Sequence, residues 1–400
     1  MRSPSLALLL ALLPAVLLAP VVARADPPAV KIGVLNDENG PFADQSGRGS
    51  VVAAQLAAED FAREAPGMRV EIVYADHQNK PDVARQIVGA WLDRDGVTAV
   101  ADAVNSGVGL AINGLIHDKN KTFLASNVGT SDLTGKFCQP TTVQWTFDTW
   151  ALGNSAARAL YKAGPFYFVS FDYALGKALV RDTTAALKRL GGSVAGEVEH
   201  PLGTTDFSSY LLQAQSSGAK VIAFASTGAD FINAVKQAAE FGANKTAMLT
   251  GLFTQITDVD ALGLQAAQGL LVTEAFYWDT DDKTRAFAHR FAERMPGRVP
   301  TENQAGVYSS VLAYLRAVKA AGSVDGDKVV AAMKAQPVDD PLFGPVTVRA
   351  DGRAIHRMLV FRVKAPGDSH ARWDDYGPVE TIPPDEAFRP LADGGCPLIH

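Results

Sequence analysis

The chain has 400 residues, of which 47% are hydrophobic and 20% are charged, and its formal net charge is −6 at pH 7. This composition is typical of a globular protein with enough apolar material for more than one core, and the length favours two folded units. An acidic chain without a basic cluster is a poor binder of nucleic acid and of anionic membranes, so neither partner is expected.

The first 25 residues have the pattern of a secretory signal peptide. Arg2 supplies the positive start, residues 6–22 are almost entirely apolar, and residues 23–25 have the small-x-small pattern of a cleavage site. The alternative is a transmembrane anchor, but Pro14 and Pro20 interrupt the apolar run, which is short for a spanning helix. We therefore expect a secreted protein.

From residue 30 onward, short apolar runs rich in β-branched residues alternate with longer, alanine-rich helical segments. Strands are expected at residues 30–35, 69–75, 97–104 and 122–125, with helices at 50–63, 80–94 and 108–119. Beyond Gly164 the pattern restarts, with strands at 166–171, 193–200, 220–225 and 247–250 and helices at 176–190, 207–216 and 230–241. Such alternation predicts right-handed βαβ units, and nearly continuous hydrophobic strands are typical of parallel sheets covered on both faces. The expected fold is α/β, with two parallel sheets of one type rather than one large sheet.

The last part of the chain is less regular. Helices are expected at residues 280–294, 305–321 and 328–335, strands at 346–348 and 358–363, and an extended arm from Pro366 onward. The two cysteines, Cys138 and Cys396, lack the spacing of a metal site. In a secreted chain they are expected to form a disulfide that ties the arm to the body, and a pair of buried thiols is the alternative.

Two neighbouring strand ends are followed by polar loops. Ligands of parallel α/β sheets bind at the carboxyl ends of the strands, where helix N-termini present free N–H groups. The loops are Asn105-Ser106-Gly107 and residues 126–132. Ser106 alone is a typical helix cap, and Thr130 or Ser131 a typical turn residue. Together, the two loops offer hydroxyls and exposed amides, which predicts a pocket for a carboxylate or another small anion.

The motifs of the common enzyme classes are absent from the sequence. There is no complete dinucleotide-binding glycine loop and no GxxxxGK[ST], GxSxG or HExxH pattern. The seven histidines lie outside the strand-end loops, and Asp37 and Glu38 are interpreted as solvated loop acids rather than as an acid–base pair. We therefore expect no catalysis, no cofactor and no metal ion. A secreted hydrolase is the weakest alternative, because no nucleophile–base pair is recognisable.

These loops resemble, in their order and spacing, those of periplasmic type I solute-binding proteins of ABC importers, the leucine/isoleucine/valine-binding-protein family. The resemblance is carried by Gly40-Pro41, Asn105-Ser106-Gly107 and residues 127–133, 173–176 and 269–273. A closer resemblance, to the branch that handles aromatic and other simple carboxylates, rests on residues 130–136, 145–150 and 394–397. The family implies a periplasmic location and a membrane permease as partner, and we expect a monomer.

The resemblance further implies two doubly wound parallel-sheet lobes joined by three crossovers, with the ligand trapped between them. One lobe would comprise about residues 27–143 and 273–343, and the other about 150–272 and 344–400. The family's ligand contacts correspond to Ser106, Asn127, Gly129 and Thr130 in the first lobe and to the loops of Tyr173, Thr227, Leu252 and Phe253 in the second. Asn105, Phe42, Gln45, Trp150 and Tyr308 are expected near the cleft, while Arg48 is interpreted as a solvated helix-start residue.

The function implied is capture of a small molecule by lobe closure, and a ligand sensor of the same fold for a regulatory partner is the alternative. Amino-acid binders of the family place an acid where this chain has Leu252, and the nearest acid, Asp258, lies well past that loop. A buried ammonium facing leucine would lose its counter-charge. The expected ligand is therefore a carboxylate without an α-ammonium group, and an aromatic one in particular. A short aliphatic acid, or a branched-chain or other amino acid, is the alternative.

Overall fold

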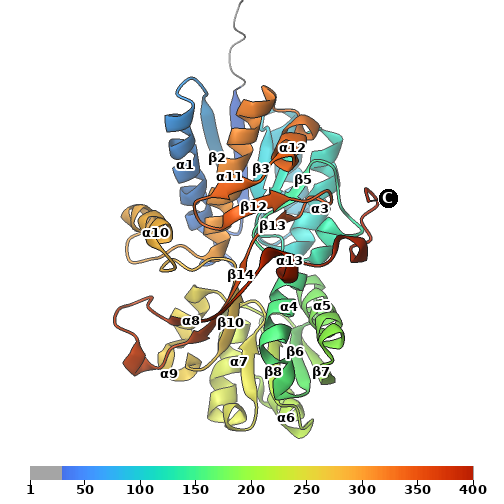
Figure 1. Cartoon of the computed structure of the whole chain (residues 1–400), viewed down its shortest axis with the longest axis vertical. Coiled ribbons are helices and arrows are strands. Elements are labelled where there is room, and N and C mark those ends of the chain that lie inside the picture. Colours follow the sequence, from blue (N-terminus) through green and yellow to red (C-terminus); the bar gives the residue numbers. More distant parts are fainter. Residues whose placement is uncertain (1–28, 400) are drawn as a thin grey trace, which may run out of the picture.

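The computed structural model describes residues 29–399, which form two α/β lobes, one above the other in Figure 1. The predicted signal peptide lies outside the described residues. Within residues 29–399, no helix combines the length and the apolar character that crossing a membrane requires.

The upper lobe in Figure 1, called lobe I, is built on a five-stranded parallel sheet in the order β2-β1-β3-β4-β5. Its strands are β1 (Val30–Asn36), β2 (Val70–Asp76), β3 (Ala99–Asp102), β4 (Thr122–Ala125) and β5 (Thr142–Gln144). Its helices are α1 (Gly47–Glu64), α2 (Pro81–Asp93), α3 (Ser106–Asp118), α11 (Glu302–Ala321) and α12 (Gly326–Ala335). Every residue of β3, β4 and β5 is buried, as expected for strands covered on both faces.

The lower lobe, called lobe II, contains a seven-stranded sheet in the order β15-β14-β10-β9-β8-β6-β7. Its strands are β6 (Phe166–Phe171), β7 (Val194–His200), β8 (Val221–Ala225), β9 (Met248–Gly251), β10 (Leu271–Glu274), β14 (Met358–Val363) and β15 (Tyr376–Ile382). Its helices are α4 (Thr149–Leu160), α5 (Ala174–Leu190), α6 (Ser208–Ser216), α7 (Gly228–Glu240), α8 (Ile256–Leu262) and α9 (Leu264–Ala267). The predicted fold class, two parallel-sheet lobes with helices around them, is confirmed.

The chain passes between the lobes after β5, after β10 and before β14. The second passage contains α10 (Asp282–Arg294), and the third follows a small sheet of β11 (Val338–Asp340), β12 (Gly344–Val348) and β13 (Ala354–Ile355). Arg353, just before β13, forms a bridge with Gln144 of β5, so this small sheet lies beside lobe I. The exact lobe boundaries stay a proposal, and this bridge favours a third boundary nearer residue 355 than 343.

Two of the segments that differ from the sequence-based prediction lie in the C-terminal part of the chain. The expected arm from Pro366 is not wholly extended, because β15 adds an antiparallel strand to β14 at the edge of the lobe II sheet. Helix α11 begins three residues earlier than predicted: Thr301 and Gln304 form a reciprocal capping box at its start. This earlier start brings Glu302 and Asn303 into the first turn of the helix.

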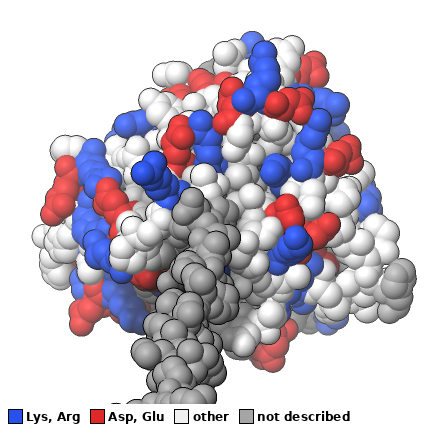
Figure 2. Space-filling view, turned by 90° about the horizontal axis from the view of Figure 1, so that it is seen from above, with Lys and Arg blue, Asp and Glu red and all other residues white. Residues whose placement is uncertain are grey.

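The predicted disulfide between Cys138 and Cys396 is confirmed, with the two Cα atoms 5.6 Å apart. Figure 2 shows the molecule from above, where basic and acidic side chains are interspersed rather than gathered into a patch of one sign.

Candidate functional site

The two polar loops at the ends of β3 and β4 meet in lobe I, as predicted. Asn105 caps α3, since its side-chain oxygen accepts hydrogen bonds from the backbone N–H groups of Gly107 and Val108 at 2.8 and 3.2 Å. The alternative interpretation of Ser106 as the helix cap is therefore wrong. The Ser106 hydroxyl is buried and accepts a hydrogen bond from the backbone N–H of Thr130 at 3.2 Å.

A buried carboxylate holds the second loop in place. Asp102 accepts hydrogen bonds from Asn127 Nδ2 at 2.6 Å and from Ser46 Oγ at 3.0 Å, and burial raises its pKa to about 6. Its φ of 80° is a left-handed value that is uncommon outside glycine. Asn127 Oδ1 is buried and has no hydrogen-bond partner among the described residues. Such an acceptor marks a position where a donor from a ligand or a water molecule is expected.

Gly129 lies where the two lobes meet. A Cβ atom at this position would stand 2.8 Å from Leu175 Cδ1 of lobe II, 3.6 Å from Ser106 Oγ and 3.9 Å from the ring of Phe147. A larger residue would force these neighbours apart. Glycine thus lets Leu175 approach the backbone of this loop beside the Ser106 hydroxyl, and a loop of amides next to a hydroxyl suits a carboxylate.

A second contact between the lobes lies at Thr227, which precedes α7. Gln45 of lobe I donates from Nε2 to Thr227 Oγ1 at 2.7 Å, and Asp258 accepts from Thr227 Oγ1 at 3.2 Å and from Gln45 Nε2 at 3.3 Å. The expectation that Asp258 lies away from the cleft is wrong, because α8 turns it back toward Thr227. Its carboxylate also accepts from the backbone N–H of Gln255 at 3.0 Å, and burial raises its pKa to about 6.

The remaining side chains of this region are apolar. Leu252 and Phe253, which follow β9, are buried, and the Phe253 ring lies 4.8 Å from that of Phe147. Phe42, on the lobe I loop before α1, is also buried. Tyr173, directly before α5, is partly buried and packs on Phe171 with 5.4 Å between ring centroids.

The structure does not bring Trp150 and Tyr308 to this group. The Trp150 ring lies under the Arg189 guanidinium, 5.8 Å away. Arg189 is near the far end of α5, sixteen residues and about 24 Å along the helix from Tyr173, so Trp150 lies far from Tyr173 as well. The Tyr308 hydroxyl donates to Asp60 Oδ2 at 2.6 Å, and its ring packs on Phe287 at 4.7 Å, between the helices of lobe I and α10. Both aromatic side chains serve helix packing.

The structure contradicts the prediction for Asp37 and agrees with that for Arg48. Asp37 is buried rather than solvated: it accepts hydrogen bonds from the backbone N–H groups of Gly40 and Phe42 and from Asn79 Nδ2, so it holds the loop after β1. Arg48 is exposed and lies over the ring of Tyr74 at 5.1 Å, in agreement with its interpretation as a solvated residue.

Buried acids line the second passage between the lobes. Glu302, in the first turn of α11, accepts hydrogen bonds from Gln255 Nε2 at 2.8 Å and from the backbone N–H of Ala275 at 2.7 Å. Glu274, at the end of β10, accepts from the Tyr376 hydroxyl at 2.6 Å. Burial raises the pKa of Glu302 to about 8, and burial together with the Glu302 charge raises that of Glu274. The Glu302 carboxyl is therefore expected to hold a proton near neutral pH.

The raised pKa of Glu302 predicts a pH-dependent stability. Because its pKa is higher in the folded than in the unfolded chain, folding takes up a proton between about pH 4.5 and 8, and stability falls as pH rises through this window. Glu302→Gln should flatten this slope and raise the free energy of unfolding at pH 8 relative to that at pH 5. Urea unfolding at pH 5 and pH 8 measures both effects, and an unchanged slope in the variant would contradict them.

Sequence reasoning did not assign Asp102, Asp258, Glu302 and Phe147 to the site. Asp102 holds the Asn127 loop within lobe I, and the other three lie in or beside the contacts between the lobes. A signal existed for Glu302, because the Thr301–Gln304 capping pattern places it in the first turn of a helix. For Asp258, the capping box with Gln255 indicates that a helix begins there, but it does not indicate in which direction that helix runs in the structure. In residues 29–399, no group of three or more His, Cys, Asp or Glu side chains is arranged to hold a metal ion.

The chain has clear similarities to known proteins. A family model described as "periplasmic binding protein" matches residues 29–369. A periplasmic binding protein from Burkholderia mallei is 42% identical, with a TM-score of 0.89 over 94% of this chain and 100% of that one. A branched-chain amino acid ABC transporter periplasmic ligand-binding protein from Burkholderia xenovorans is 41% identical, with a TM-score of 0.84 over 92% and 99% of the two chains. A solute-binding protein from Rhodopseudomonas palustris, in complex with p-hydroxybenzoic acid, shares the fold at 20% identity, with a TM-score of 0.80 over 89% and 98%.

Proposed function

Because this chain belongs to the periplasmic binding protein family, we propose that it captures a small carboxylate between its lobes and delivers it to a membrane permease. It is a periplasmic substrate-binding protein of an ABC transporter and not an enzyme. One observation carries the finer proposal: the backbone at Gly129, beside the Ser106 hydroxyl, lies directly against Leu175 of the other lobe.

In the proposed mechanism, lobe I binds the carboxylate first. The Ser106 hydroxyl accepts from Thr130 N–H, so it keeps its own proton to donate to a carboxylate oxygen, and the backbone N–H of Gly129 is proposed to donate to the other. Lobe II then closes over the ligand and adds the Gln45–Thr227 contact. Only interactions that are made in the closed state shift the population toward closure.

Ser106→Ala should weaken binding of the cognate ligand by about 1–3 kcal/mol, the range for a hydrogen bond to a charged group. Isothermal titration calorimetry measures this loss. Ser209→Ala, an exposed serine on α6 of lobe II, is the matched control and should leave affinity unchanged. Equal affinities of the Ser106→Ala variant and the wild type would remove Ser106 from the binding site.

The ligand we propose is a carboxylate without an α-ammonium group, aromatic in particular. Leu252 and Phe253 supply an apolar wall, and Phe147 extends it from the passage between the lobes. Asp258 supplies no free counter-charge for an ammonium, because Gln45, Thr227 and the Gln255 backbone already donate to its oxygens. The Rhodopseudomonas protein illustrates that this fold can enclose an aromatic acid.

An amino acid is the second candidate, and Asp258 is the observation that favours it. If a ligand ammonium displaced Gln45 from Asp258, a buried carboxylate would face it across the cleft. The Burkholderia xenovorans relative, described as a branched-chain amino acid binder, points the same way.

A thermal-shift screen against a library of carboxylates and amino acids tests the proposed function. A ligand at 100 times its Kd adds about 2.7 kcal/mol to the stability of the folded state, which is readily detected. Stabilisation by carboxylates supports the proposal. If no carboxylate in the library, amino acids included, stabilises the protein at millimolar concentration, capture of a small carboxylate is contradicted.

A further inference from the structure

The C-terminal segment formed by residues 383–396 contacts both lobes and the passages between them. We call this segment the strap. It follows β15 of the lobe II sheet and ends at Cys396, which is bonded to Cys138 of lobe I. The cysteines are 258 residues apart in the sequence. Figure 1 shows the C-terminus beside lobe I, although the strand that leads to the strap belongs to lobe II.

The strap is bound to two helices of lobe II. Asn154 Nδ2 of α4 donates to the backbone oxygen of Glu386 at 2.8 Å, and Arg158 of the same helix forms an ion pair with the Glu386 carboxylate. Near the other end of the strap, Arg189 of α5 forms an ion pair with Asp393.

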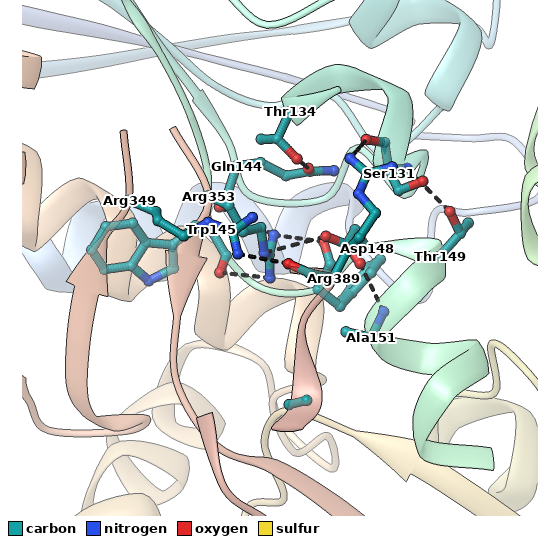
Figure 3. Close-up of polar contacts among 12 residues, drawn as sticks. Ser131, Thr134, Gln144, Trp145, Asp148, Thr149, Ala151, Arg349, Arg353 and Arg389 are labelled. Atoms are coloured by element: carbon teal, nitrogen blue, oxygen red, sulfur yellow. Dashed lines mark hydrogen bonds and ion pairs between the residues drawn. The ribbon is translucent and has the colours of Figure 1, made fainter. Parts of the chain in front are cut away.

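Between these points the strap is bound to lobe I. Arg389 Nη2 donates to the backbone oxygen of Ser131 at 3.0 Å, and Arg349 Nη1 donates to the backbone oxygen of Arg389 at 2.7 Å. The Ser131 loop and these arginines come together in Figure 3. The disulfide adds a covalent anchor seven residues further along the chain.

The middle of the strap covers the passages between the lobes. Phe388 is buried, with the Arg353 guanidinium 4.4 Å above its ring and the His356 ring 5.2 Å away. Arg353 in turn donates to the backbone oxygens of Gln144 at 3.1 Å and Phe147 at 2.9 Å, on the first passage between the lobes (Figure 3). Phe388 thus packs on the residues that join the first passage to the third.

The spacing of these contacts makes the strap short. Glu386 is bound by lobe II and Arg389 by lobe I. These two attachment points are three residues apart along the chain, a length that can span at most about 10 Å. The lobes can separate further at this edge only if one set of contacts breaks. The disulfide keeps a released strap near its sites, so that the contacts re-form as intramolecular ones at high effective concentration.

We propose that the strap limits how far the two lobes open, and that the Cys138–Cys396 disulfide keeps it in place. The proposal rests on the proposed function only in taking lobe movement as the step that admits the ligand. Because the strap binds both lobes in a conformation where they already touch, it favours the closed over the open form.

Distances between the lobes in the ligand-free protein test this proposal. Spin labels at Gln86→Cys on α2 and Gln213→Cys on α6, both exposed, report the separation by double electron–electron resonance. With the native disulfide intact, we expect one narrow distance distribution. The Cys138→Ser/Cys396→Ser variant and, separately, Arg389→Ala should broaden the distribution about twofold, toward longer distances.

Lys119→Ala, which breaks an ion pair with Asp93 inside lobe I, is the control and should leave the distribution unchanged. If the variant without the disulfide does not fold, Arg389→Ala still decides the question with the disulfide in place. Distributions that match the control in both strap variants would overturn the proposal. Since no ligand is added, the outcome does not depend on which ligand the protein binds.

Discussion

Replacing Arg353 with methionine should lower the free energy of unfolding by about 3–5 kcal/mol, the cost typical of removing one partner of a buried ion pair. The Arg353 side chain is fully buried and lies 3.4 Å from the Asp148 carboxylate. It also donates to the backbone oxygens of Gln144 and Phe147. Methionine fills much of the volume but leaves Asp148 without its cation and both carbonyls without donors.

Urea unfolding at neutral pH measures this loss. Arg372→Met is the matched control, because the Arg372 side chain is 65% exposed in its ion pair with Asp260 and such pairs contribute at most about 1 kcal/mol. A loss of less than about 1 kcal/mol in the Arg353→Met variant would show that water or rearranged side chains satisfy these groups. The conclusion that Arg353 stabilises the passages between the lobes would then be refuted.

Gly129→Val should weaken ligand binding about 10- to 100-fold. A Cβ at position 129 stands 2.8 Å from Leu175 Cδ1 of the other lobe, and the two methyl groups of valine need further space. Overpacking of this kind costs about 1–3 kcal/mol. The clash is present only when the lobes are together, so the full cost falls on the closed form.

Calorimetric titration with the cognate ligand measures the loss, and thermal unfolding without ligand checks the stability. Gly114→Ala on α3 serves as the control, because a Cβ at position 114 would have no atom within 4 Å and the substitution should leave affinity unchanged. Wild-type affinity in the Gly129→Val variant would mean that ligand binding does not require the contact between this loop and Leu175.

The fold could be predicted from the sequence because its signals are local. Strands such as β4 and β6 are continuous apolar runs with every residue buried, and the helices between them have lengths that fit βαβ units. The meeting of Ser106 and Thr130 was also predictable, since the carboxyl ends of neighbouring parallel strands share one edge of the sheet.

The rest of the site depends on contacts between segments far apart in the chain. Asp258 was assigned away from the cleft because sequence distance does not reveal that α8 turns back toward Thr227. Trp150 and Tyr308 were expected in the cleft, but a single sequence does not distinguish an aromatic ring that packs between helices from one that lines a pocket. The strap was missed for the same reason: its partners Asn154, Ser131 and Arg353 lie in three separate segments.

Calorimetric titration of the wild-type protein with benzoate, 4-hydroxybenzoate and leucine tests the central claim most directly. With an apolar wall at Leu252 and Phe253 and no free counter-charge for an ammonium, we predict micromolar binding of at least one aromatic acid and no detectable binding of leucine. Micromolar binding of leucine, without any response to the aromatic acids, would contradict the account and assign Asp258 as the partner of a ligand ammonium.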